Sequence, residues 1–164
     1  MITRGHDFVE INGVKWATCN LGAEKPEDPG WYFMWGDNKP YQINWVSPRP
    51  RRFHPHWDGR EWIKYSLQDN KLVLDPEDDA AHVLWGGKWR VPTMDEFDSL
   101  INSSPKDIEK LGLVNGRAFW VSNKVLSGYP PEYIRLFLYD FHIELAKHMG
   151  FRDNLNCIRP VLDV

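Results

Sequence analysis

The segment 75–97 constrains the fold most, because it contains two helix starts and one helix stop in close succession. Asp75 followed by Pro76 predicts an N-cap with proline at the first helical position. The acids that follow, Glu77, Asp78 and Asp79, suit the positive end of a helix dipole, so this run is expected to need no bound cation. The pair Gly86-Gly87 predicts the end of this first helix.

A second helix is predicted directly afterwards. Thr93 and Glu96 have the T-x-x-E spacing of a capping box. The apolar residues with helical spacing are Ala81, Leu84 and Trp85 in the first helix, and Met94, Phe97, Leu100 and Ile101 in the second. The run 103–105 (Ser-Ser-Pro) predicts the end of the second helix, and a short helical piece is expected over 105–111.

Strand signals flank the helices on both sides. Asn12-Gly13, between "FVEI" and "VKWAT", is a strong signal for a two-residue β-hairpin, and the aromatic segment 31–35 also predicts a strand. After residue 117, "AFWVSN", "IRLFLYDFHIEL" and "CIRPVL" have strand composition. Residues 134–145 alternate with a period of two and are predicted as one strand. Helices that precede a terminal antiparallel meander predict a single α+β domain over residues 1–164.

Composition narrows the classes of function. The chain has 164 residues, a formal net charge of −3 and a hydrophobic fraction of 42%. At this length it can bury a core without disulfides or bound metals. Because basic residues are not in excess, nucleic acid is not an expected partner. No run approaches the ~20 apolar residues of a membrane helix, so membrane insertion is not expected either. Cys19 and Cys157 are predicted to be small buried residues. A disulfide between Cys19 and Cys157 is an alternative only if the terminal strands lie side by side.

The loop 39–65 is the main candidate for a binding surface. Loops of this length are usually functional, and this one interleaves aromatic residues with arginine, the residue types enriched at interface hot spots. The candidate residues are Tyr41, Trp45, Arg51, Arg52, Phe53, His56, Trp57, Arg60 and Trp62. They suit a protein partner or stacking on a glycan. The alternative is that the aromatic rings hold the loop against the protein's own core.

Three blocks together resemble a known family. They are "VKWATCNLGAEKPEDPGWYFMWGD", "LDPEDDAAHVLWGGKWRVPTMDEFDSLI" and the ending "AFWVSN … IRLFLYDF … CIRPVL". In this order they resemble the Fibrobacter succinogenes major paralogous domain family and the related DUF1566 domains. The resemblance implies a C-type-lectin-like fold, with two helices packed on short antiparallel sheets and long irregular loops. Formylglycine-generating enzymes share that fold.

Under this resemblance the Trp-Arg-Val-Pro-Thr run is a fold signature rather than a reaction site. The residues assigned to this structural motif are Trp16, Trp35, Asp78, Asp79, Trp85, Trp89, Arg90, Pro92, Thr93, Glu96, Trp120 and Arg159. Arg90 and Arg159 are predicted to be buried guanidinium groups that pair with carboxylates or loop carbonyls. Asp78 and Asp79 are candidates for such a carboxylate partner.

The motifs of related enzymes and lectins are incomplete in this sequence. The formylglycine-generating enzymes imply two nearby cysteines close to the C-terminus, which are missing here. The related sulfoxide synthases use His-x-x-x-His-x-Glu, and His142 and Glu144 match only its tail. The calcium-dependent sugar tripeptides Glu-Pro-Asn and Gln-Pro-Asp do not occur, and His54 with His56 lacks a third metal ligand. No catalytic residue, metal site or cofactor is therefore expected, with calcium kept as a less favoured alternative.

The sequence thus predicts a non-enzymatic partner-binding module. Its N-terminus has no signal-peptide pattern, so we expect a component of a larger assembly, in the virion or cytoplasm of the producing cell. The range of the resembled family points to a Bacteroidetes phage virion, as a capsid decoration, fibre or tail accessory. The first alternative is a secreted or cell-surface adhesin that binds glycan or protein. A metalloenzyme of the formylglycine-generating kind is the second.

Overall fold

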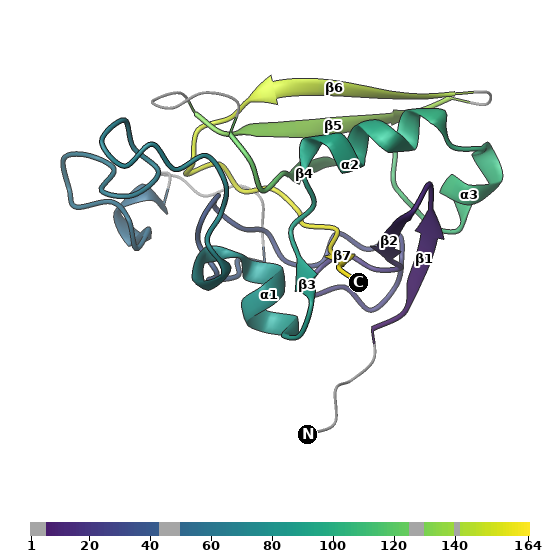
Figure 1. Cartoon of the computed structure of the whole chain (residues 1–164), viewed down its shortest axis with the longest axis horizontal. Coiled ribbons are helices and arrows are strands. Elements are labelled where there is room, and N and C mark those ends of the chain that lie inside the picture. Colours follow the sequence, from purple (N-terminus) through teal and green to yellow (C-terminus); the bar gives the residue numbers. More distant parts are fainter. Residues whose placement is uncertain (1–5, 43–49, 125–129, 140–141) are drawn as a thin grey trace.

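Two small antiparallel sheets with short helices between them build this α+β protein (Figure 1). The structure is a computed structural model and describes residues 6–42, 50–124, 130–139 and 142–164. The coarse prediction of an α+β domain is confirmed. No helix among these residues is long and apolar enough to cross a membrane.

The first sheet joins distant parts of the chain. Its strands are β1 (Phe8–Ile11), β2 (Val14–Ala17), β7 (Val161–Leu162) and β3 (Trp89–Arg90), hydrogen-bonded in that order. The hairpin at Asn12-Gly13 is confirmed: Ile11 pairs with Val14, and both turn residues have positive φ, at 52° and 81°. Two consecutive positive φ values define the type I′ turn that suits the twist of a hairpin. The strand predicted from "CIRPVL" is shorter than expected, because β7 spans only its last two residues.

The second sheet is a three-stranded meander made of β4 (Ala118–Trp120), β5 (Glu132–Leu138) and β6 (Ile143–Met149). The prediction of one strand over 134–145 was wrong, since the chain reverses between β5 and β6. Tyr139 N donates to His142 O at 2.9 Å across this reversal. A period of two does not reveal where a strand folds back. One strand of that length would run about 40 Å, beyond the core that covers it.

Short helical elements follow one another in the middle of the chain. They are η1 (Pro50–Phe53), η2 (Pro76–Asp78), α1 (Ala80–Trp85), α2 (Met94–Ser99), η3 (Leu100–Asn102) and α3 (Pro105–Glu109). The capping box is confirmed, with Glu96 N donating to Thr93 Oγ1 at 3.2 Å and Thr93 N donating to Glu96 Oε1 at 2.8 Å. In Figure 1, α2 runs beneath β5 and β6.

The start of the first helix differs from the prediction. Asp75 precedes η2, but its side chain caps no backbone group. Asp79 is the N-cap of α1, and its Oδ1 accepts from His82 N at 3.0 Å. The helical turn that Asp75-Pro76 announces is a 3₁₀ turn, and the α-helix begins one turn later. Two residues assigned to the apolar faces were also misplaced, because Leu84 is 40% exposed and Ile101 is 47% exposed.

The core consists of two clusters, and large aromatic residues pack in both of them. In the first, Trp16 packs on Phe97, which in turn contacts Phe119 beneath the meander. In the second, Trp35 and Trp120 are buried, and their indole N–H groups donate to the carbonyls of residues 121 and 33. The paired indole donors fasten the segment 31–35 to the meander. That segment forms isolated bridges rather than the predicted strand.

Candidate functional site

A pocket of about 310 Å³ lies where three distant parts of the chain meet: the segment 51–68, residues 124 and 130, and the pair 151–152. Three cationic side chains line it, Arg51, Lys124 and Arg152. Aromatic rings from Trp62, Tyr65 and Phe151 form much of the remaining wall. A concave, largely apolar wall with a few convergent polar groups is the usual form of a ligand site. This pocket is therefore the candidate functional site.

Local turns hold the aromatic wall in place. Trp57 and Trp62 pair across a short bridge, and Asp58 Oδ1 closes the turn between them by accepting from the backbone of residues 60 and 61 at 2.8 Å. Tyr65 takes a left-handed conformation, with φ of 57°. The carboxylate of Asp69 stabilises it, because Oδ2 accepts from Tyr65 N at 2.8 Å. The chain here is ordered by side chain to backbone bonds, which compete well with regular structure.

Arg152 is the most unusual group of the pocket. It is only 5% exposed, and its guanidinium carbon lies 4.1 Å from the ring centre of Trp62, 5.5 Å from Tyr65 and 5.6 Å from Trp35. Nη1 donates to Lys64 O at 2.7 Å. Nε and Nη2 are buried and have no hydrogen-bond acceptor in the described part of the chain. Burial lowers the pKa of Arg152 to about 10, so it keeps its charge at neutral pH.

Lys124 is a second buried cation beside it. This lysine is 5% exposed, and Nζ donates to Tyr65 O at 2.9 Å. Burial lowers its pKa, and the neighbouring charge of Arg152 lowers it further. No carboxylate of the residues described forms an ion pair with either cation. Arg51 differs, because its Nε pairs with Asp153 Oδ2 at 3.2 Å.

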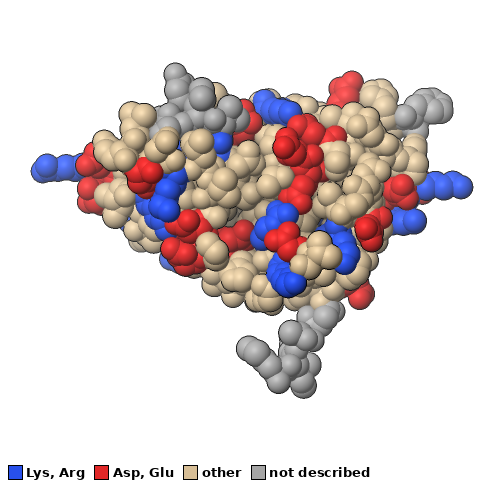
Figure 2. All heavy atoms as spheres, in the orientation of Figure 1, with Lys and Arg blue, Asp and Glu red and all other residues tan. Residues whose placement is uncertain are grey.

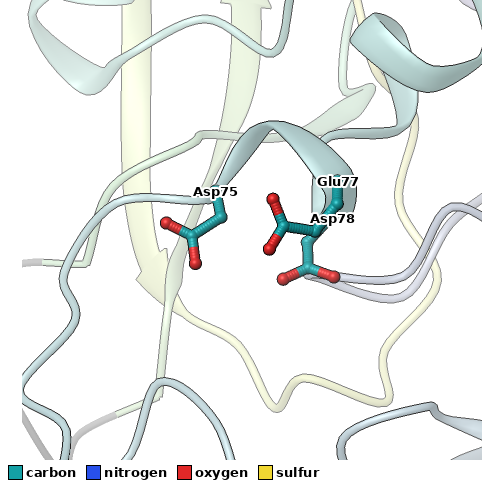
Figure 3. Close-up of side chains that lie close together, drawn as sticks. All are labelled: Asp75, Glu77 and Asp78. Atoms are coloured by element: carbon teal, nitrogen blue, oxygen red, sulfur yellow. The ribbon is translucent and has the colours of Figure 1, made fainter.

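Three carboxylates close to the pocket resemble a metal site. Asp75, Glu77 and Asp78 offer oxygens within 4.8 Å of one another, and Figure 3 shows them converging from one turn of the chain. The ammonium group of Lys64 already lies among them, at 2.9, 3.2 and 2.7 Å from Asp75, Glu77 and Asp78. Burial lowers the pKa of Lys64, but these three hydrogen bonds outweigh it and raise the pKa overall. A lysine thus balances these acids.

The acids at 77–79 lie at helix starts as predicted, with Glu77 and Asp78 in the first turn of η2 and Asp79 at the N-cap of α1, and two of them have further partners. Asp78 Oδ1 bonds His56 Nε2 at 2.8 Å, and its Oδ2 accepts from Tyr65 OH at 2.7 Å. Burial raises the pKa of Asp78, but the bonds from Lys64, Tyr65 and His56 outweigh it and lower the pKa overall. Asp79 links α1 to β3, because its carboxylate also accepts from Val91 N at 2.9 Å.

The pair His54 and His56 is committed to hydrogen bonds. His54 Nε2 bonds Trp35 O at 2.8 Å, and Nδ1 accepts from His56 N at 3.1 Å. Those two bonds require the neutral tautomer with hydrogen on Nε2. Burial lowers the pKa of His54 to about 4, which agrees with a neutral ring. Neither nitrogen of His54 is open to a metal.

Arg90 pairs with carboxylates and Arg159 with loop carbonyls, as predicted, but Arg90 is half-buried rather than buried. Arg90 forms a bidentate pair with Glu96, at 2.7 and 2.8 Å, and a further bond to Asp163. Asp78 and Asp79 do not pair with it, so that prediction was wrong. Arg159 is 1% exposed and donates to Asn20 Oδ1 and to the carbonyls of residues 17, 26 and 111 at 2.6–3.1 Å. Its expected role as a buried guanidinium on loop carbonyls is confirmed.

The tryptophans of the predicted motif are mostly core residues. Trp16, Trp35, Trp89 and Trp120 are buried, whereas Trp85 is half-buried and stacks on His6 at 3.7 Å. Pro92 O accepts from Ser122 N at 2.8 Å and so ties the motif to the segment directly after β4. The two cysteines are free, with Cys157 buried and Cys19 only half-buried.

The predicted binding residues divide into several groups. Arg51, Trp57 and Trp62 stay together, because the Arg51 guanidinium lies 5.0 and 5.7 Å from the two indole rings. His56 belongs to the Asp78 network described above. The others do not line the pocket: Tyr41 and Phe53 lie under Lys39, Arg52 covers the Phe53 ring, and Arg60 is exposed at the Asp58 turn. Trp45 falls outside the described residues.

The two buried cations of the pocket, Arg152 and Lys124, were missed at the sequence level. Phe151-Arg152 after Gly150 repeats the aromatic and arginine composition of the 41–65 loop, so the same criterion applied to the whole chain would have found Arg152. Lys124 carries no such signal, because its importance depends on burial alone. His142 and Glu144 are exposed and form a hydrogen bond at 3.2 Å.

The surface and the comparisons add limits. Figure 2 shows acidic and basic side chains intermixed over the face it presents, without a broad basic surface there. A comparison with protein-family models, curated proteins and solved structures finds no significant match to this chain. The function proposed for the protein therefore rests on the chemistry of the pocket.

Proposed function

We propose that this protein is a non-enzymatic recognition module that binds its partner through the pocket of Arg51, Lys124 and Arg152 and the adjoining Trp57–Trp62 turn. The observation that supports this most is the pair of buried cations that no carboxylate of the described residues neutralises. Charged groups are rarely buried without a partner, because desolvation costs several kcal/mol per ion. A partner that supplies negative charge would remove this cost.

The other polar clusters support a binding role over catalysis. The acids near the pocket are balanced by Lys64, and both nitrogens of His54 are engaged. A hydrolytic site pairs a nucleophile with a base that is free to take its proton. The described residues around this pocket offer cations and aromatic rings instead, the groups that dominate recognition surfaces.

For the architecture, we propose a C-type-lectin-like fold, as the sequence resemblance implies. The support is the set of elements: three short α-helices beside small antiparallel sheets, a long irregular loop, and a last strand paired with the N-terminal hairpin. An experimental structure superposed on a C-type lectin domain tests this. Strand orders in the two sheets that differ from those of the C-type lectin domain would contradict the proposal.

The setting we propose is an assembly, namely a Bacteroidetes phage virion, with other subunits as partners. This rests on the sequence resemblance. A surface adhesin that binds a glycan is the alternative. Intact particles or cells from the native source, analysed by mass spectrometry, separate them: stoichiometric recovery with capsid or tail proteins supports the virion, and recovery from the cell surface supports the adhesin.

Photo-crosslinking tests the proposed binding face directly. A photoreactive residue at Arg60, exposed on the loop, is compared with one at Lys106 on α3, which lies at the opposite end of the molecule (Figure 1). In the native assembly we expect one defined adduct from position 60 and none from position 106. Equal adducts from both positions, or none from position 60, would contradict the proposal.

A further inference from the structure

We infer that the pocket takes a carboxylate carried on an apolar or aromatic body, with the carboxylate on Arg152 and Lys124 and the body against the rings and aliphatic groups of the wall. This inference rests on the proposed binding function and names the chemistry of the group that is bound. Its support comes from the donors, the charge balance and the walls of the pocket.

The unpaired donors of Arg152 have the arrangement that a carboxylate requires. Nε–H and one N–H of Nη2 lie side by side on the same edge of a guanidinium group and point in parallel. These are the two nitrogens that lack an acceptor in the part of the chain that the structure describes, while Nη1 donates to Lys64 O. Two parallel N–H groups bind the two oxygens of one carboxylate in the bidentate manner.

Lys124 supplies the second charge at the same place. Among the described residues its Nζ has one acceptor, Tyr65 O, whereas an ammonium group carries three hydrogens. Asp69 acts on both cations through its charge but pairs with its own backbone turn. The segments outside the described residues contribute one acidic residue to the sequence, Asp140. An incoming anion is therefore attracted by two cations that lack a carboxylate partner among the described residues.

The walls favour a ligand with an apolar body over inorganic phosphate. Leu67 is 69% exposed and Phe151 is 54% exposed, and both line the pocket beside Trp62 and Pro130. Large apolar side chains at the mouth of a charged pocket lose water when an apolar group covers them. Nε and Nη2 of Arg152 are buried in the structure without ligand, so the side chains that cover them must move for the carboxylate to reach them. A bare phosphate gains nothing from such a rim.

Calorimetry with matched probes tests this inference on the whole 164-residue chain. N-acetylphenylalanine carries the carboxylate and the ring, and N-acetylphenylalanine amide differs only in the charge. We expect the acid to bind at least about tenfold more tightly than the amide, because hydrogen bonds to charged groups are the strong ones. Equal binding of acid and amide, or tighter binding of inorganic phosphate than of the acid, overturns the inference.

Substitutions locate the binding to the pocket. Lys124→Met keeps the side-chain length and removes the charge, and Lys106→Met makes the same change at an exposed position on α3. We expect Lys124→Met to weaken binding of the acid at least about tenfold, and Lys106→Met to leave it unchanged. The chemical shift of the Trp62 indole N–H is a second readout, which the acid perturbs in the wild type. Unchanged affinity in Lys124→Met contradicts the site.

The source of the carboxylate is resolved by two further probes. Both arms share the carboxylate chemistry, so either result supports it. A hexapeptide that ends in phenylalanine with a free carboxylate, binding more tightly than N-acetylphenylalanine, indicates capture of a chain terminus. Binding no tighter than that of the small acid indicates a free organic acid. If crosslinking at position 60 succeeds while all these acids fail to bind, the recognition function stands and this inference falls.

Discussion

Arg159 and Arg152 are both buried guanidinium groups, yet their surroundings differ sharply. Arg159 is 1% exposed and donates four hydrogen bonds, to one side-chain oxygen and three carbonyls. Arg152 is 5% exposed and donates one, while two of its nitrogens have no acceptor in the described structure. Burial lowers the pKa of each to about 10.

The difference supports a structural role for Arg159 and the proposed ligand-binding role for Arg152. The loop carbonyls around Arg159 need its donors, so the loops and the cation stabilise each other. Around Arg152 three aromatic rings attract the positive charge, but Nε and Nη2 have no acceptor among the described residues. A ligand can supply the acceptors that the fold does not provide for such a group. Until the ligand binds, the unmet donors lower the stability of the folded protein.

The largest effect is expected from Arg159→Met. This change leaves Asn20 Oδ1 and three buried carbonyls without their donor, and each unsatisfied group costs about 1–3 kcal/mol. The free energy of unfolding, measured by urea titration, should fall by at least about 3 kcal/mol. A loss below about 1 kcal/mol would show that these carbonyls find other donors.

Asp79→Ala should come next, with a loss of about 2 kcal/mol or more. It removes the acceptor for His82 N and Val91 N, both at the junction of α1 and β3. The matched control is Asp75→Ala, since Asp75 caps no backbone group and forms partly exposed ion pairs. That control should lose less than about 1 kcal/mol. Equal losses of unfolding free energy in the two variants would indicate that Asp75 also caps the helix, which would contradict the assignment of the N-cap to Asp79.

Glu96→Gln should have a smaller, pH-dependent effect of about 1 kcal/mol at neutral pH. Burial raises the pKa of Glu96, but the bonds from Arg90 and Thr93 outweigh it, so the pKa lies below 4.5. A depressed carboxyl pKa stabilises the folded state above the ordinary pKa, and this stability is lost as pH falls through the folded value. The difference in unfolding free energy between the wild type and the Glu96→Gln variant should therefore shrink below pH 4.5. A difference that stays constant down to about pH 2 would contradict this ion pair.

Lys124→Met should change stability least, by no more than about 1 kcal/mol in either direction. Removing a buried cation that lacks a carboxylate partner relieves desolvation, and this offsets the lost bond to Tyr65 O. Thermal unfolding without ligand measures the change. A drop as large as that of Asp79→Ala would mean that Lys124 is a structural residue like Arg159.

Local patterns in the sequence predicted local structure well. The Asn12-Gly13 turn and the Thr93–Glu96 capping box involve neighbours in the chain, and both are confirmed. The N-cap was displaced from Asp75 to Asp79 because both residues satisfy the same local preference. The backbone of Val91, distant in sequence, selects between them.

The pocket could not be predicted because its parts meet only in the folded chain. Arg51 and Trp62 were candidates from their composition, but the loop gives no hint that Lys124 and Arg152 join them. The unsatisfied donors of Arg152 are a property of its packing, which no spacing in the sequence records. Likewise, the acids near residue 77 were interpreted without Lys64, the side chain that balances them.

The most direct test is the free energy of unfolding of Arg152→Met, measured in urea beside Arg159→Met. We predict that the free energy of unfolding of Arg152→Met stays within about 1 kcal/mol of the wild type, because the lost cation–π contacts are offset by the removal of an incompletely bonded charge. Arg159→Met should lose at least about 3 kcal/mol in the same experiment. If Arg152→Met loses as much as Arg159→Met, then Arg152 is part of the scaffold, and the pocket has no unmet charge for a ligand to complete.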